Sequence, residues 1–270
     1  MAAAALLQLA PLALHRFDAP AHWQVIECLS DVHLTAEAPR TFDAWRMQML
    51  GGDADALFIL GDLFEAWVGD DARDGDFEHA CVDVLREAGA QRTVAVMHGN
   101  RDFLIGEALL AHCGARALPD ATVLHAFGHR TVLTHGDALC LEDTEYQRFR
   151  AMVRNPAWQA EFLKRPLPER QAMARAMRDA STAHQAQLSP ALWADIDPAA
   201  ALQLLDAAGS DTLVHGHTHR PGRVVLSATA ARHVLSDWDF DGNAPRGNVL
   251  RLTARGVHAV PARALDAERA

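Results

Sequence analysis

The sequence lacks the features of several common protein classes. It contains a single Tyr and only four Cys, and no stretch approaches the ~18 consecutive apolar residues of a membrane-spanning helix. The cysteines form no C-x-x-C pair, and their spacing matches no zinc module: they are Cys28, Cys81, Cys113 and Cys140. We therefore expect reduced, mostly buried thiols in a cytosolic protein, without a disulfide framework or a structural zinc.

Net positive charge is also missing. The formal net charge is −10, which disfavours a nucleic-acid partner because such partners select basic surfaces. No obligate protein partner is evident either. With 270 residues, half of them hydrophobic, the chain is long enough for one large domain or for a domain with an insertion.

The first residues are rich in Ala and Leu but do not read as a secretory signal. No Lys or Arg precedes Arg16, and Pro11 interrupts the apolar stretch. We predict that residues 1–23 are an extension ahead of the fold, that the domain covers 24–262, and that 263–270 form a tail.

Short apolar runs, each followed by polar residues, predict buried strands. These runs cover residues 25–29, 56–60, 93–97, 131–134 and 212–214. Further strands are expected at 224–227, 233–236, 249–252 and 257–260, in a second sheet or as an extension of the first. Apolar residues at helical spacing predict helices over 41–50 and 77–88. The alternation of strands and helices predicts an α/β layered fold.

Residues 143–205 break this alternation and predict a helical cap insertion. Helical patterns appear at 147–153 and 169–179, among prolines. Residues 146–180 include eight basic and three acidic residues, so this stretch has a local net charge of +5. Two interpretations stay open: a solvated helix face, or a basic surface for phosphates or anionic lipid.

Polar residues at the predicted strand ends carry the strongest functional signal. Ligands of open α/β sheets bind beyond the carboxyl ends of the strands. Seven nitrogen or oxygen donors follow five strands, with Gly beside most of them: Asp31, His33, Asp62, Asn100, His135, His217 and His219. A single Asp or His after a strand is usually a turn or cap residue, but the full set predicts one metal-binding crevice.

The donors are imidazole, carboxylate and amide without thiolate, which suits Mn²⁺ or a similar ion. Because seven ligands are too many for one ordinary site, we predict two ions with Asp62 as a bridging carboxylate. One ion is assigned to Asp31, His33, Asp62 and His219, and the other to Asp62, Asn100, His135 and His217. Two such ions activate a hydroxide and clamp the attacking and leaving oxygens of a phosphoryl displacement.

The pattern D-x-H, GD, GN, H and GHxH, in that order, resembles the calcineurin-like metallophosphoesterase superfamily. The resemblance implies a two-sheet αββα sandwich flanked by helices, and the same metal ligands. Many members of the superfamily carry His after the Asn as a proton donor, whereas this chain has Arg101. Asp62, Asn100, Arg101 and His135 are the predicted catalytic residues.

A narrower resemblance rests on the strings at 61–71, 99–104 and 217–221. They resemble the UDP-2,3-diacylglucosamine diphosphatases, over roughly residues 24–260. This resemblance implies Mn²⁺-dependent hydrolysis of the lipid pyrophosphate to UMP and 2,3-diacylglucosamine 1-phosphate (lipid X) in lipid A biosynthesis. It also implies a peripheral protein at the cytoplasmic face of the bacterial inner membrane, with a cap that holds the acyl chains.

The resemblance also implies a set of substrate-binding residues: Asn100, Arg101, Asp143, Ser181 and His217. Tyr146 and Phe149 are expected at the mouth of the cap, although helix packing alone would explain them as well. The chain departs from the family at Gln185 and Leu188, where Asn and Lys are usual. Arg175 or Arg178 is a possible substitute for those contacts.

Two alternatives compete with this interpretation. Another metallophosphoesterase, acting on nucleotides or phosphodiesters, would share the metal ligands but would not need an apolar groove. The apolar cap residues that would line such a groove would equally form the cap's own core: Trp158, Phe162, Leu163, Met173 and Met177. A non-catalytic scaffold is disfavoured because all seven ligand positions are filled.

Overall fold

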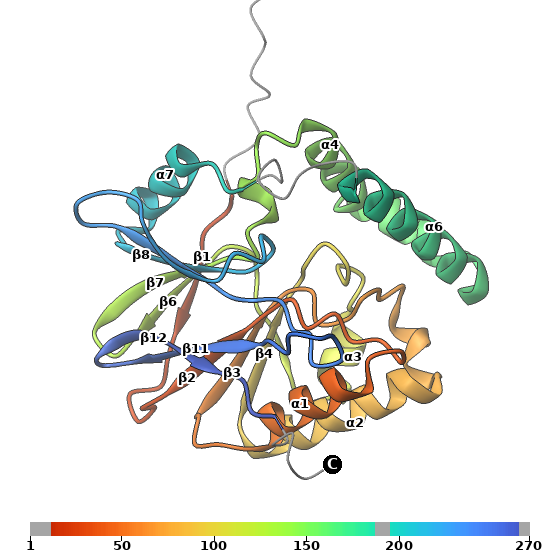
Figure 1. Ribbon diagram of the computed structural model, residues 1–270, viewed down its shortest axis with the longest axis horizontal. Helices are drawn as coiled ribbons and strands as arrows, with labels where there is room; N and C mark the ends of the chain where they lie inside the picture. The colour runs from red at the N-terminus through yellow and green to blue at the C-terminus, as the bar shows by residue number, and fades with distance from the viewer. Residues whose placement is uncertain (1–11, 187–194, 265–270) are drawn as a thin grey trace, which may run out of the picture.

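In the computed structural model, which describes residues 12–186 and 195–264, two mixed six-stranded sheets pack face to face (Figure 1). The first sheet has the order β1 (His15–Asp18), β6 (Thr122–Ala126), β7 (His129–Leu133), β8 (Thr212–His215), β10 (Ala231–Val234) and β9 (Gly222–Val225). The second has the order β12 (Gly256–Pro261), β11 (Asn248–Thr253), β2 (Ile26–Leu29), β3 (Ala56–Leu60), β4 (Thr93–Met97) and β5 (Arg116–Ala117).

The central strands are apolar along their whole length because both of their faces are buried. Successive side chains of a strand point to opposite faces. In β3, Ala56, Phe58 and Leu60 therefore enter the core between the sheets, while Leu57 and Ile59 face the helices. All five residues of this strand are fully buried. The short apolar runs of the sequence are thus the buried strands that we predicted.

Helices cover the outer faces of both sheets, which confirms the αββα sandwich (Figure 1). The second sheet is covered by α1 (Pro39–Leu50), α2 (Asp76–Gln91) and α3 (Glu107–His112), with the 3₁₀ turn η1 (Asp70–Asp74) before α2. The first sheet is covered by α7 (Pro198–Ala208). Although α7 begins inside the range predicted as cap, its apolar face packs on β7 and β8.

The helices above the carboxyl ends of the strands are α4 (Thr144–Val153), α5 (Pro156–Leu163) and α6 (Leu167–Ala186), which follow the short turn η2 (Asp137–Leu139). In Figure 1, α4 and α6 extend to one side of the sandwich, and α6 is the long helix at the upper right. These three helices are called the cap below.

Strand β1 lies within residues 1–23, the stretch assigned by sequence to an extension. It pairs in parallel with β6 at the edge of the first sheet, and only Phe17 of its four residues packs against the core between the sheets. One apolar residue in an exposed edge strand gives no periodicity from which the strand can be predicted. Strands β5 and β6 and helices α3, α5 and α7 were likewise not anticipated.

Basic residues attach the cap to the rest of the protein. Arg150 donates to buried Asp137 at 2.8 Å, and the guanidinium of Arg154 donates to the carbonyl of Gly99 at 2.9 Å. Arg170, which is only 2% exposed, forms an ion pair with Asp71. Arg178, discussed below, pairs with a carboxylate of the body although its side chain is 48% exposed. The remaining four of the eight basic cap residues are also exposed: Arg148, Lys164, Arg165 and Arg175.

The four cysteines are free and buried. Within residues 12–186 and 195–264, no helix combines the length and the apolar character that crossing a membrane requires.

An ion pair beside the return from the cap is expected to stabilise the fold. Two oxygens of Asp195 each accept a hydrogen bond of 2.7 Å from Arg232. Asp195→Asn should lower the free energy of unfolding at pH 7 by about 1–3 kcal/mol, measured by denaturant titration. Asp18→Asn, which removes an exposed pair with Arg16, is the control and should change nothing.

The pKa of Asp195 falls from 3.8 to about 2, because the hydrogen bonds from Arg232 outweigh the burial that raises it. A lowered carboxyl pKa stabilises the folded state above the unfolded value, and this stabilisation is lost as pH falls through the folded value. The difference between Asp195→Asn and the parent should therefore shrink between pH 3.8 and about 2. A pH-independent difference would contradict this account.

Candidate metal centre

Strand ends from both sheets bring the seven predicted ligands together. Loops after β2, β3 and β4 of one sheet and after β7 and β8 of the other converge on one point. They carry, in chain order, Asp31 and His33, Asp62, Asn100, His135, and His217 and His219. His33 and His219, which are 186 positions apart in the sequence, thus meet above the sandwich.

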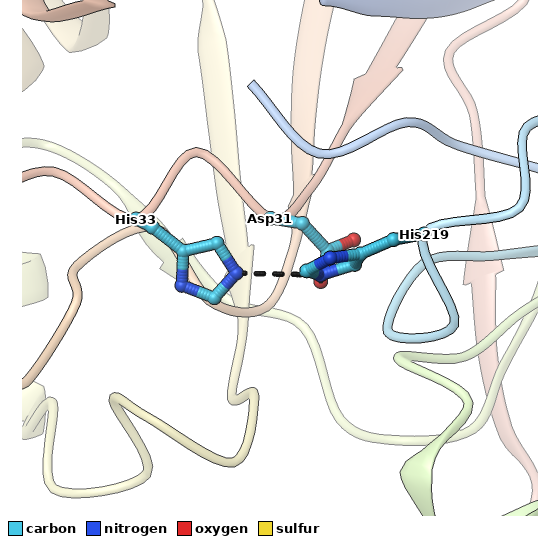
Figure 2. A group of neighbouring side chains, drawn as sticks. All are labelled: Asp31, His33 and His219. Carbon is cyan, nitrogen blue, oxygen red and sulfur yellow. Dashed lines mark hydrogen bonds and ion pairs between the residues drawn. The ribbon is translucent and has the colours of Figure 1, made fainter. Parts of the chain in front are cut away.

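One group of ligand atoms surrounds His33. Its Nε2 lies 3.4 Å from Nε2 of His219 and 4.0 Å from Oδ2 of Asp62. Nε2 of His219 is in turn 3.4 Å from Oδ1 of Asp31. Figure 2 shows His33 and His219 pointing toward each other beside Asp31. One ligand atom of each of these three residues lies within 4.8 Å of the others. This arrangement suits a cation bound by one lone pair from each of the three residues.

A second group surrounds His135. Its Nε2 lies 3.0 Å from Oδ1 of Asn100 and 3.7 Å from Oδ1 of Asp62. The same Asn100 oxygen is 2.8 Å from Nδ1 of His217. One oxygen of Asp62 thus faces the first group and the other faces the second. Asp31 also lies within reach of Asp62 and His135. The assignment of each ligand to an ion stays a prediction.

The backbone at these positions is strained. Of the six non-glycine residues with positive φ among those the structure describes, five are predicted ligands: Asp31, His33, Asp62, His217 and His219. Asp and His tolerate this left-handed conformation better than most residues, but it is still uncommon. Such outliers gather at functional sites, where the surrounding structure holds them in place.

Two glycines allow the ligand loops to approach closely. A Cβ at Gly99 would lie 2.0 Å from Oδ1 of Asp62, and one at Gly216 would lie 2.2 Å from Oδ2 of Asp31. Only glycine leaves room for these carboxylates. The glycines beside the ligands are therefore required by packing.

Hydrogen bonds fix the ligands in place. Nδ1 of His135 is 2.9 Å from the carbonyl oxygen of Leu60, which directs Nε2 toward the site. Buried Asp102 accepts hydrogen bonds from the amides of Gly99 at 2.8 Å and Leu63 at 2.7 Å, and so joins two ligand loops. Sequence reasoning gave Asp102 no role, although it stands in the Gly-Asn-Arg-Asp string.

Burial and opposite charges shift the pKa values of the ligands in different directions. Burial lowers the pKa of His135, but the nearby carboxylates of Asp62, Asp137 and Asp31 more than offset it and raise the value to about 9. Burial, together with the charge on His135, lowers the pKa of His217 to about 3. Without a metal, the site therefore holds a proton on His135 at neutral pH.

A cavity of about 410 Å³ opens beside the ligands and beneath the cap. Its polar lining includes Asn100, Arg101 and Asp143, three of the predicted substrate-binding residues, together with Glu65, Glu145, Tyr146 and Arg178. Its apolar lining includes Trp67, Val68, Phe103, Leu104, Phe149, Trp158, Phe162, Ala174 and Met177. Of the five apolar cap residues named from the sequence, three line the cavity, while Met173 packs on the core and Leu163 is exposed.

Arg101 lines this cavity and is fixed beside a predicted metal ligand. Its amide donates to Oδ1 of Asp62 at 2.8 Å, and its carbonyl accepts from the amide of Trp67 at 3.1 Å. Its Nε is buried and has no hydrogen-bond partner among the residues that the structure describes. A buried, unsatisfied guanidinium nitrogen is suited to an anion that enters the cavity.

Tyr146 connects the cap to the metal ligands. Its hydroxyl donates to Oδ2 of Asp137 at 2.6 Å, and its ring lies 5.8 Å from the imidazole of His217. Asp143 caps the first turn of α4 by accepting from the amide of Tyr146 at 2.9 Å. Asp137 was not predicted as functional, although it follows His135 in the His-Gly-Asp string.

Three positions named from the sequence fall outside the described side chains. Ser181 and Gln185 lie on α6, but their side chains are outside the described residues, as is the whole of Leu188. The substrate-binding role of Ser181 stays a prediction, and so does the effect of the departures from the family at Gln185 and Leu188.

Comparisons with known proteins agree with this geometry. The family model described as calcineurin-like phosphoesterase matches residues 26–221. The chain is 43% identical over 243 residues to a Chromobacterium violaceum protein named UDP-2,3-diacylglucosamine hydrolase, covering 87% of this chain and 98% of that protein. Proteins of the same name from Xanthomonas oryzae pv. oryzae and Bordetella pertussis are each 43% identical, covering 85% and 84% of this chain and 95% and 91% of theirs.

Among solved structures, Vps29 from Cryptosporidium parvum aligns with a TM-score of 0.45 and 13% identity, over 89% of this chain and 86% of that one.

Metal binding should displace protons from the site. Because a metal needs the neutral imidazole of His135, whose pKa is about 9, Mn²⁺ binding at pH 7 should release protons. The apparent affinity should rise by about tenfold per pH unit toward pH 9. Calorimetric titration in buffers of different ionisation enthalpy measures this release. Binding without proton release at pH 7 would contradict the protonation of His135.

The stability of the metal-free protein should depend on pH through the protonation of His135. A raised histidine pKa stabilises the folded state below its unfolded value of 6.5, and this stabilisation is lost as pH rises through about 9. The Tm of the metal-free protein should therefore fall between these values. The loaded protein serves as the control and should not show this fall.

Proposed function

The chain belongs to the calcineurin-like phosphoesterase family, and we propose that it hydrolyses the pyrophosphate bond of UDP-2,3-diacylglucosamine. Water is added across the P–O–P bridge, and the products are UMP and 2,3-diacylglucosamine 1-phosphate. The reaction belongs to lipid A biosynthesis. The similar proteins of this name support the substrate.

One observation carries this proposal: the cavity beside the metal ligands is lined by both polar and apolar side chains. A nucleotide sugar with acyl chains also combines polar and apolar parts. Its phosphates match Asn100 and Arg101, and its acyl chains match Phe103, Trp158 and Met177.

Two Mn²⁺ ions are the proposed cofactors. The donor set supports this, since it combines imidazole, carboxylate and amide groups without thiolate, and Asp62 turns one oxygen toward each ligand group. When bound, the metals supply an activated nucleophile and neutralise phosphate charge.

The side chains around the metals position the substrate. The guanidinium of Arg101 binds a phosphate oxygen and stays charged, so it stabilises the increasing negative charge without transferring a proton. Asn100 is a proposed metal ligand and also contacts the same phosphate. Asp143 and Ser181 line the sugar–acyl side of the substrate, and His217 also binds it. Tyr146 and Phe149 line the cavity.

We further propose a peripheral location at the cytoplasmic face of the inner membrane. The substrate and one product carry acyl chains. Exposed Met152, Leu163 and Met177 lie on the cap helices together with the exposed basic residues named above. Apolar and basic side chains on one element favour contact with an anionic lipid surface.

The second candidate is a metallophosphoesterase for chain-free nucleotides or phosphodiesters, which the metal ligands alone would permit. The apolar walls favour the acylated substrate, because a chain-free substrate would leave them in contact with water. Comparable kcat/KM for UDP-2,3-diacylglucosamine and for UDP-N-acetylglucosamine would favour this second candidate.

Purified protein with Mn²⁺ should release UMP from UDP-2,3-diacylglucosamine, and EDTA should stop the release. Asp62→Ala should abolish activity because both ligand groups lose a carboxylate oxygen. If the protein instead cleaves only a simple phosphodiester in the presence of Mn²⁺, the metal site stands and the substrate is wrong.

Arg101→Ala should reduce turnover by about 10²-fold or more, the cost typical of losing one charge-stabilising donor, while metal content stays near normal. Arg148→Ala is the matched control because it removes an exposed arginine of the cap. Metal content is measured by elemental analysis. Loss of metal in Arg101→Ala would contradict the role given to this residue.

A further inference from the structure

Glu65 lies between the metal ligands and the cap. The preceding residue, Phe64, forms an isolated parallel β-bridge with Leu34. The backbone amide of Glu65 donates a hydrogen bond of 3.1 Å to the carbonyl oxygen of Leu34. This contact fixes the backbone of Glu65 beside the loop that carries His33. Its side chain is only 16% exposed, so its carboxylate needs partners.

One carboxylate oxygen contacts a predicted metal ligand. Oε2 lies 3.2 Å from Nδ1 of His33, while Nε2 of the same ring faces Asp62 and His219. A carboxylate that accepts the Nδ1 proton of a metal-binding histidine fixes both the tautomer and the ring orientation. The 3.2 Å contact is an ion-pair contact without the alignment of a hydrogen bond. A small turn of the ring on metal binding would let Glu65 accept the Nδ1 proton and would leave the lone pair of His33 on the nitrogen that faces the site.

The other oxygen contacts the cap. Oε1 lies 2.8 Å from Nε of Arg178 on α6 and 3.7 Å from the guanidinium of Arg101. Arg170 holds the first half of α6 through Asp71, whereas Arg178 reaches the body of the protein through Glu65. Glu65 and Arg178 both border the 410 Å³ cavity and also a second cavity of about 310 Å³. This pair thus separates two spaces beneath α6.

We propose that Glu65 is a positioning residue that joins the metal site to the cap. It fixes His33 for metal binding through one oxygen, and it fixes α6 above the substrate cavity through the other. Exposed ion pairs contribute little to stability, and Arg178 is 48% exposed. Glu65 is only 16% exposed, however, and each of its oxygens has a separate partner. The part that concerns substrate binding rests on the proposed function; the parts that concern metal affinity and α6 do not.

Three variants separate the two contacts. Glu65→Gln keeps an oxygen that can accept from His33 but loses the charge that pairs with Arg178. Glu65→Ala loses both contacts, and Arg178→Gln loses only the ion pair with the cap. Glu161→Gln is the control, because it removes an exposed ion pair of the cap with Lys164 that touches neither cavity.

Metal affinity tests the contact with His33. Titration of the metal-free proteins with Mn²⁺ should show a loss of about 10- to 100-fold for Glu65→Ala. Glu65→Gln should lose much less, and Arg178→Gln and Glu161→Gln should match the parent. An unchanged affinity in Glu65→Ala would overturn this half of the proposal.

Hydrogen exchange and KM test the contact with the cap. Backbone amides over residues 172–180 should exchange faster in Glu65→Gln and in Arg178→Gln, and the KM for UDP-2,3-diacylglucosamine should rise in both with a smaller change in kcat. The double variant should be no worse than either single variant, because both remove the same contact. Additive effects, or unchanged exchange, would overturn this half.

The two proposals can fail separately. If the parent releases no UMP while Glu65→Ala loses metal affinity and the two ion-pair variants loosen α6, the substrate assignment fails and the role of Glu65 stands. If the parent turns over the substrate while these variants match it in metal affinity, exchange and KM, the role of Glu65 fails and the function stands.

Discussion

The placement of the Asp62 carboxylate is the constraint on which the rest of the site depends. Its two oxygens face different groups of ligands, so a small displacement would disturb both. The fold holds it through a left-handed backbone, a neighbouring Gly99 that leaves room for an oxygen, and Asp102, which binds the adjoining amides. Each of these features costs stability or sequence freedom, and together they keep buried lone pairs facing one another where a metal would bind.

The cap is held in place by charge, and this determines the character of the cavity. Arginines of the cap helices pair with carboxylates that lie next to ligand loops: Arg150 with Asp137, and Arg178 with Glu65. Their apolar neighbours are then free to line the space between the cap and the sandwich. The cavity therefore combines polar side chains, among them Asn100 and Arg101, with apolar side chains from the cap and the sandwich.

Much of the fold was predictable because its central strands are buried on both faces. Such strands read as short apolar runs, and β2, β3, β4, β7 and β8 were all located from them. Elements at the edges of the sheets were harder to predict from the sequence. Strand β1 has one residue in the core, and the two residues of β5 are both exposed, so neither has a hydrophobic pattern. Helix α7 was assigned to the cap because its contact with the first sheet has no local signal.

The sequence by itself determined the α/β layered class, the strand ends and the chemical types of the seven ligands, since these depend on local patterns of apolar residues, glycine and metal-binding side chains. The two-sheet αββα arrangement came from the family resemblance. Only the tertiary structure decided which partners those ligands have. The contacts of Glu65 with His33 and Arg178, and of Asp137 with Tyr146, join segments that local periodicity does not relate. A charged residue has the same local appearance whether it faces water or a buried partner, so the count of basic cap residues did not reveal which of them point inward.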